Sequence, residues 1–155
     1  MSSQVRTVAT DAGRRLSVER VVAAGVESAW ERLVALDEWP SWGPTVHAVD
    51  AGGAETVRPG LTGRVRVGPT SALATWASFE ITDCTAPGEG GEGDAGDDTG
   101  RWRWTVAGVA ATGHVVAPVA DGRARVAFRT PPWAVGYVPV LKRGLAAVAE
   151  QVESA

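Results

Sequence analysis

The sequence has one cysteine, one lysine and two histidines among its 155 residues. A single cysteine, Cys84, excludes an intrachain disulfide and a metal cluster built from several thiolates. His47 and His114 lack the spacing of a zinc-binding helix, so we predict no metal site, and no motif calls for a cofactor. No apolar run approaches the ~20 residues of a membrane span, and residues 1–16 lack the apolar centre of a signal peptide. We therefore expect a cytoplasmic protein that does not insert stably into a membrane.

The chain also lacks a strong excess of charge of either sign. Its net charge is −3, and five of its 18 acidic residues lie in one glycine-rich segment, residues 87–100. The rest of the chain is close to neutral, which gives no electrostatic reason to expect a nucleic-acid partner. The glycine-rich segment has no side chain able to pack, so we predict a mobile hairpin loop. Its carboxylates do not have the spacing of a calcium-binding loop.

Two tryptophans stand close together in the stretch DEWPSWGP, where Pro40 follows Trp39 and Gly43 follows Trp42. Upstream, residues 16–24 are rich in β-branched side chains and predict a strand, and the apolar spacing in residues 26–34 predicts a short helix. Pro40 cannot continue that helix, and it disfavours the helical conformation for the residue before it. The two tryptophans are therefore expected on a broken helical elbow, where they either close the end of the core or wall the entrance of a cavity.

Most of the remaining chain alternates apolar and polar residues, which is the pattern of strands with one buried and one solvent-exposed face. The clearest case is RWRW at residues 101–104, which predicts both arginines outside and both tryptophans inside. Asp121-Gly122 is a two-residue hairpin turn of the kind that needs positive φ. With the first strand, the predicted strands are residues 16–24, 45–50, 61–67, 73–84, 101–108, 113–120 and 123–130.

The C-terminal segment predicts a long helix, because Val138, Leu141, Leu145, Val148 and Val152 form one apolar stripe. The whole order predicts an α+β fold with a seven-stranded antiparallel sheet, two short helices after the first strand and a long last helix. Residues 1–15 are polar and aperiodic, so we expect a flexible N-terminal arm. Residues 16–155 would then form a single domain.

Several stretches resemble the helix-grip superfamily that groups START lipid-transfer domains, polyketide cyclases and birch-pollen-allergen-like proteins (SRPBCC). They are the entry to the first helix (21–30), with Gly25 where proline is usual, the elbow EWPSWGP (38–44), GHVV (113–116), and DGRARV (121–126), with Ala124 in place of the common threonine. The resemblance is to a polyketide cyclase/dehydrase-like bacterial member and covers about residues 16–153. It implies a sheet curled around the C-terminal helix, with a hydrophobic cavity between the two.

The strand phases and this resemblance together predict which side chains line the cavity. The residues predicted to bind a ligand are Trp30, Val65, Val67, Phe79, Trp102, Trp104, His114, Val116, Phe128 and Leu141. Among them His114 is the one titratable side chain, and it would either form a polar floor for the ligand or be a core residue satisfied by its neighbours.

Four residues are candidates for catalysis: His114, Arg20, Asp83 and Tyr137. Arg20 shares a strand face with apolar residues, and an inward arginine would need an anionic partner. Asp83 lies at a strand end, and Tyr137 begins the last helix. The four form no recognisable cluster in the sequence, and no nucleophile elbow, phosphate loop or dinucleotide fingerprint is present.

Three classes of function therefore remain open. The first is binding of a hydrophobic small molecule, lipid-like or polycyclic, by a monomer or homodimer. The second is an aromatase/cyclase or dehydratase that acts on a polyketide-like chain in the same cavity, which would need a proton donor and acceptor there. The third is a protein–protein adaptor that docks through an exposed apolar patch near Trp133.

Overall fold

The computed structural model describes residues 2–89 and 98–154 and contains one antiparallel sheet with three helices. The strands are β1 (Gln4–Thr10), β2 (Gly13–Val22), β3 (Val46–Asp50), β4 (Thr62–Val67), β5 (Thr75–Thr85), β6 (Gly100–Val106), β7 (Val109–Pro118) and β8 (Ala124–Thr130). The helices are α1 (Val26–Val34), α2 (Trp39–Trp42) and α3 (Val138–Glu153). The sheet order is β1-β2-β8-β7-β6-β5-β4-β3, so most neighbours in sequence are also neighbours in space.

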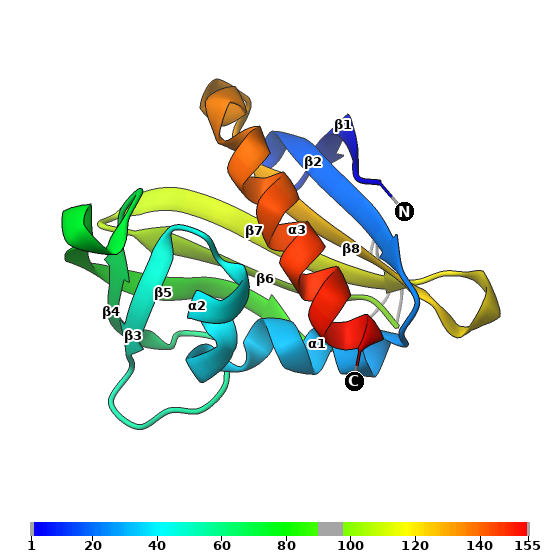
Figure 1. Ribbon diagram of the computed structural model, residues 1–155, viewed down its shortest axis with the longest axis horizontal. Helices are drawn as coiled ribbons and strands as arrows, with labels where there is room; N and C mark the ends of the chain where they lie inside the picture. The colour runs from blue at the N-terminus through cyan, green and yellow to red at the C-terminus, as the bar shows by residue number, and fades with distance from the viewer. Residues whose placement is uncertain (1, 90–97, 155) are drawn as a thin grey trace.

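Helix α3 lies across one face of the curved sheet, while α1 and α2 lie at one end of it (Figure 1). The residues of α3 that face the sheet are those of the predicted apolar stripe, and the buried ones are Leu141, Gly144, Leu145, Val148, Ala149 and Val152. A sheet curled on a long C-terminal helix is the helix-grip arrangement, so the predicted fold class is confirmed.

The predicted alternation of strand faces is also confirmed. Trp102 and Trp104 of β6 are buried, whereas Arg101 and Arg103 are partly exposed. Because the side-chain period of a strand is two residues, this local pattern decides which face of β6 meets the helix. At the β7–β8 connection, Asp121 and Gly122 have φ of 64° and 70°, as the turn prediction required.

The sheet has eight strands rather than the seven predicted, because most of the segment predicted as a flexible arm, residues 1–15, is β1 and the start of β2. The two strands pair from Gln4 opposite Glu19 to Thr10 opposite Gly13. Strand β1 is an edge strand that is mostly exposed on both faces, so it shows no apolar alternation in the sequence. Backbone hydrogen bonds and an ion pair between Arg6 and Glu19 (2.9 Å) hold it in the sheet.

Two further predictions concern the elbow and the glycine-rich loop. Trp39 is the first residue of α2, with φ −53° and ψ −44°, so the prediction that Pro40 keeps it out of the helical region was wrong. Proline is tolerated because it lies in the first turn, where backbone N–H groups have no helical partner. The mobile loop predicted for residues 87–100 lies largely outside the described residues, which omit 90–97.

Candidate ligand-binding cavity

A cavity of about 320 Å³ lies between the sheet and α3. Its wall comes from α2, β3, β4, β6, β7, β8, α3 and the 3-10 segment η4 (Pro132–Tyr137). The lining residues are Trp39, Trp42, Gly43, Pro44, Thr45, Val46, Val67, Trp102, Trp104, Val106, Ala110, Ala111, Thr112, His114, Phe128, Thr130, Pro131, Trp133, Ala134, Tyr137, Val140, Leu141 and Gly144. Within the described part of the chain, no Asp, Glu, Lys or Arg lines it, so the wall is apolar apart from hydroxyl, imidazole and indole groups.

Flat aromatic rings form one wall of the cavity. The rings of Trp39 and Trp102 stack with their centroids 5.1 Å apart and their planes at 8° to each other. The ring of His114 also stacks on Trp102, with the two centroids 3.7 Å apart. Trp104 meets the Trp39 ring edge-on at 5.0 Å. Because these rings pack on one another, they form a wall that is apolar and fixed in orientation.

The indole N–H groups of the two elbow tryptophans, Trp39 and Trp42, both donate hydrogen bonds to the backbone of α1. The indole N–H of Trp39 donates to the carbonyl of Leu33 (3.0 Å), and that of Trp42 donates to the carbonyl of Arg32 (3.3 Å). Both carbonyls lie in the last turn of α1, where no helical N–H can reach them. The tryptophans therefore cap α1 with their N–H groups and leave their rings to line the cavity.

A chain of hydrogen bonds crosses the floor of the cavity. The indole N–H of Trp104 donates to Thr112 Oγ1 (3.1 Å), Thr112 Oγ1 lies 3.0 Å from His114 Nε2, and His114 Nδ1 lies 3.4 Å from the Trp102 carbonyl. A carbonyl oxygen only accepts, so Nδ1 carries the proton and Nε2 accepts from the threonine hydroxyl. Burial lowers the pKa of His114 to about 3, partly opposed by its hydrogen bond to the Trp102 backbone, so the ring is neutral.

Two polar groups on the cavity wall keep unused hydrogen-bonding capacity. The indole Nε1 of Trp102 is buried and has no hydrogen-bond partner among the described residues. The hydroxyls of Tyr137 and Thr45 bond to each other, which uses one of their two protons and leaves the other free. The hydroxyl pair, rather than the imidazole nitrogens of His114, is available to a ligand.

The residues predicted to bind a ligand divide into two groups. Those on the cavity wall are Val67, Trp102, Trp104, His114, Phe128 and Leu141. Val65, Phe79 and Val116 do not line the cavity, because they are enclosed in the core between sheet and helices. Trp30 also lies away from it: a Cβ on Gly100 would come within 2.6 Å of its ring, so Trp30 covers the start of β6.

The four predicted catalytic residues do not come together. His114 and Tyr137 line the cavity, but Asp83 lies on the outer face of the sheet, where its carboxylate is 3.1 Å from Arg103 and 3.5 Å from Arg101. Arg20 lies on the face of β2 that is turned towards α3, opposite Val126 of β8. It is partly buried and does not line the cavity. The cavity thus contains neither of the two charged candidates.

Sequence reasoning missed two hydroxyls, Thr45 and Thr112, that take part in the polar contacts of the wall. Thr112 could have been found, because it is in phase with His114 on β7 and therefore shares its face. Thr45 lies just before β3, and no periodicity applies there. Among the described residues, no three His, Cys, Asp or Glu side chains are grouped as metal ligands would be, and no helix is both long and apolar enough to cross a bilayer.

Comparison with known proteins rests on structure alone. No protein-family model matches the sequence. No curated protein matches it. Solved structures do match: human StAR-related lipid transfer protein 5 aligns over 99% of this chain and 83% of its own, with 11% identity and a TM-score of 0.66. A STAR-related lipid transfer protein fragment from Xanthomonas axonopodis covers 96% and 90%, with 15% identity and a TM-score of 0.61.

A third similar structure is the di-domain aromatase/cyclase StfQ from the steffimycin biosynthetic pathway. It aligns over 88% of this chain and 44% of its own, with 10% identity and a TM-score of 0.59. These identities are too low to transfer a function, but the coverage shows that the whole chain has the fold of START domains and aromatase/cyclases. The resemblance first noted in the sequence is therefore confirmed at the level of the fold.

Proposed function

We propose that this protein binds a hydrophobic small molecule in the cavity between the sheet and α3. The observation that carries the proposal is an apolar cavity of about 320 Å³ in which tryptophan rings form a wall. Apolar ligand surface removed from water contributes roughly 25 cal/mol per Å², so such a site binds with few polar contacts. The lipid-transfer proteins with the same fold support this class of ligand. A cytoplasmic monomer or homodimer remains part of the proposal.

The form of the wall narrows the ligand to a flat, polycyclic molecule with a carbonyl or hydroxyl oxygen. Aromatic side chains from α2, β6 and β8 border the cavity, and aromatic walls favour contact with the flat rings of a ligand over a flexible chain. The hydroxyls of Thr45 and Tyr137 keep one unused proton on the cavity wall, and a ligand oxygen would accept it. The volume is near the lower end of the range for ligand sites, which favours a compact ring system over a two-chain lipid.

Catalysis on a polyketide-like substrate is the second candidate, favoured by the aromatase/cyclase with the same fold. Such a reaction needs a positioned proton donor and acceptor. Tyr137 can donate, but both nitrogens of His114 are engaged by Thr112 and Trp102, and no carboxylate lines the described wall. We therefore favour binding over turnover.

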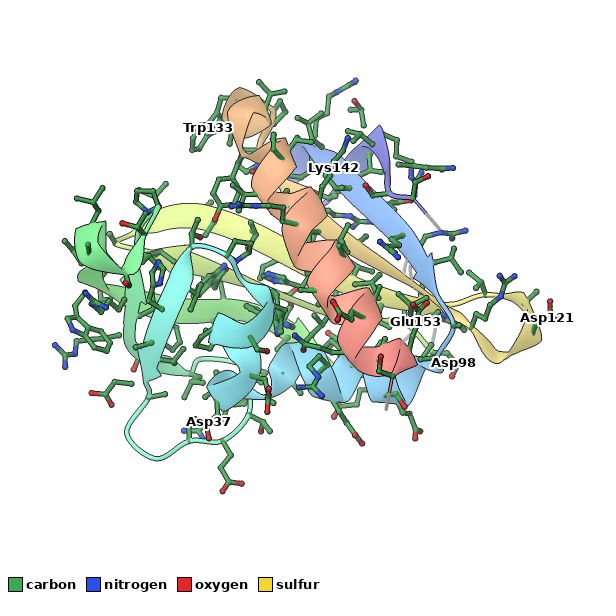
Figure 2. The ribbon with its side chains drawn as sticks, in the orientation of Figure 1. Asp37, Asp98, Asp121, Trp133, Lys142 and Glu153 are labelled. Atoms are coloured by element: carbon green, nitrogen blue, oxygen red, sulfur yellow. The ribbon has the colours of Figure 1, made fainter. Side chains whose placement is uncertain are left out.

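The adaptor hypothesis rests on Trp133, which is 73% exposed, and Val135 nearby in η4. Figure 2 shows Trp133 beside the N-terminal end of α3, at the margin of the molecule. Trp133 also lines the cavity, so its exposure fits a ligand entrance as well as a partner surface. Binding of a small molecule accounts for both observations.

Native mass spectrometry of the purified protein tests the proposal by detecting a co-purified ligand. A titration followed by tryptophan fluorescence with a hydroxyanthraquinone, and in parallel with palmitate, tests the ligand class. We expect saturable binding of the anthraquinone and weaker binding of palmitate. Tyr137→Phe keeps a ring but removes one hydroxyl of the pair with Thr45, and it should weaken binding by roughly three- to tenfold. Trp76→Phe, on the exposed part of β5, should have no effect. The proposal would be contradicted if neither the hydroxyanthraquinone nor palmitate bound.

A further inference from the structure

A second hollow, of about 680 Å³, extends over the outer face of the sheet, and it shares Trp104, Ala110, Ala111 and His114 with the lining of the apolar cavity. It is bounded by the end of the β1–β2 hairpin on one side and by β6, β7 and β8 on the other. Four arginines line it, together with a single carboxylate from Asp11: Arg15, Arg101, Arg103 and Arg129. Alternation places arginines on this solvated face of the sheet, but the hydrophobic ligand gives no reason for four of them to border one hollow.

The strand register places two of these arginines, Arg103 and Arg129, in one row across the outer face together with Arg6 of β1. Arg6 is opposite Ser17, Ser17 opposite Arg129, Arg129 opposite Gly113, and Gly113 opposite Arg103. The hairpin bends over the row, since the carboxylate of Asp11 in its turn lies 3.0 Å from Arg103 on β6. The hollow is thus a built feature of three strands and a hairpin rather than a chance group of surface side chains.

Gly113 forms the floor of the hollow between two of the arginines. A Cβ at this position would lie 3.4 Å from Arg103 Cγ and 3.6 Å from Arg129 Cβ. With no side chain there, a ligand can approach the strand between the two guanidinium groups. Larger residues would fill the space that the arginines border.

The cations near this hollow outnumber the anions. Arg6, Arg101 and Arg103 have carboxylate partners within 4 Å, which are supplied by Glu19, Asp83 and Asp11. Asp83 is shared between Arg101 and Arg103. Among the residues that the structure describes, five guanidinium groups therefore lie near three carboxylates, an excess of two positive charges.

Arg129 is the least compensated of these residues. It makes no ion pair within the described part of the chain, and its buried Nε has no hydrogen-bond partner there. Burial lowers the pKa of Arg129; Glu19 opposes that effect, while Arg6, Arg101 and Arg103 add to it. A half-buried cation among like charges is unfavourable unless an anion completes the group. Arg15, which lines the same hollow, also has no carboxylate within 4 Å among the described residues.

We propose that this hollow binds a phosphate-type dianion, with Arg129 at its centre and Arg15, Arg101 and Arg103 around it. The two negative charges of the dianion match the excess of two positive charges. The guanidinium group of an arginine can also donate two parallel hydrogen bonds to two oxygens of one phosphoryl group. The volume exceeds what one phosphate ion fills, so the site accommodates a small phosphate monoester as well as the free ion. Asp11, Glu19 and Asp83 would repel a chain of phosphates, which favours a single phosphoryl group over a nucleic acid.

Isothermal titration calorimetry tests this site with inorganic phosphate and with glycerol 3-phosphate, against sodium chloride at matched ionic strength. Both probes are too polar for the apolar cavity, so the result is independent of the proposed hydrophobic ligand. We expect saturable one-to-one binding of phosphate that chloride does not reproduce. Tighter binding of glycerol 3-phosphate would identify the natural ligand as a monoester, and equal binding would identify the free ion.

Arg129→Gln should weaken phosphate binding at least about tenfold, because it removes the central positive charge and the paired N–H donors of the guanidinium group. The matched control is Arg125→Gln, on the same strand and face but exposed and outside the hollow, and it should change binding by less than about twofold. If Arg129→Gln does not fold by circular dichroism, Arg15→Gln and its neighbour Arg14→Gln form a second pair, and only the first should weaken binding. No saturable binding, equal losses within a pair, or tighter binding of a short single-stranded DNA than of glycerol 3-phosphate would overturn the proposal.

Discussion

The imidazole of His114 lies flat on the indole of Trp102, with ring centroids 3.7 Å apart, and its Nδ1 bonds to the carbonyl of the same residue. The hydroxyl of Thr112 donates a hydrogen bond to Nε2, the other ring nitrogen of His114. The histidine that the sequence placed on the inner face is there, but its polar atoms are turned to the protein rather than left for a ligand. Its contribution to the cavity is the face of a neutral ring.

The buried neutral state of His114 makes stability depend on pH. The folded protein holds the pKa of His114 at about 3, below the ordinary value of 6.5, so the unfolded chain binds more protons between these values. Stability should be highest above about pH 7 and fall as the pH drops towards 3. Urea unfolding should show a loss of about 2 kcal/mol between about pH 7.5 and about pH 5.

The matched variant for this effect is His114→Phe, which keeps an aromatic ring on Trp102 and removes the titrating group. It should be less stable at neutral pH by about 1–3 kcal/mol, because the Thr112 hydroxyl loses its acceptor and the Trp102 carbonyl loses a donor. Its stability should change much less between the same two pH values. An unchanged pH dependence in the variant would show that other groups cause the loss.

The capping role of Trp39 can be separated from its packing role. Trp39→Phe keeps a ring against Trp102 but removes the N–H that donates to the Leu33 carbonyl. We expect the free energy of unfolding to fall by about 1–3 kcal/mol, since a buried carbonyl at the end of α1 loses its donor. Chemical denaturation measures this, with Trp76→Phe as the exposed control. Equal stability of the two variants would show that the hydrogen bond contributes little.

Trp104→Ala should affect both stability and ligand binding. Trp104 is buried against Trp39, Trp102 and Phe79, and its N–H holds Thr112. Truncation of a buried tryptophan costs about 3–5 kcal/mol. Thermal unfolding and the fluorescence titration measure the two effects, and Trp133→Ala, which removes an exposed ring, should leave stability within about 0.5 kcal/mol of the parent. A Trp104→Ala protein of near-parental stability would contradict the packing described for this ring.

The single cysteine should react slowly. Burial raises the pKa of Cys84 to about 11, and the charges of Asp83 and Glu89 add to the effect. Since the thiolate is the reactive form, alkylation by iodoacetamide near neutral pH should be about a hundredfold slower than for a free thiol. Asp83→Asn removes one of the negative charges and should speed the reaction. Labelling at the rate of free cysteine would show that the thiol is more exposed than the structure indicates.

Sequence patterns determined much of this protein by themselves. Alternation at residues 101–104 assigned the inner and outer faces of β6, Asp121-Gly122 marked the β7–β8 turn, and the apolar stripe that begins at Val138 located α3. Each of these depends on residues close together in the chain, where the period of a strand or helix decides which side chains share a face. The order of elements then led to the helix-grip fold.

Tertiary structure alone decided the rest. Val65, Phe79 and Val116 have the same inward phase as Trp102 and Trp104, yet they fill the core while the two tryptophans border open space. Where a cavity remains depends on the volumes of side chains that meet from distant strands, and no local period encodes that sum. Strand β1 escaped prediction because edge pairing depends on backbone hydrogen bonds rather than apolar side chains, and only the bend of its hairpin brings Asp11 to Arg103 over the arginine row.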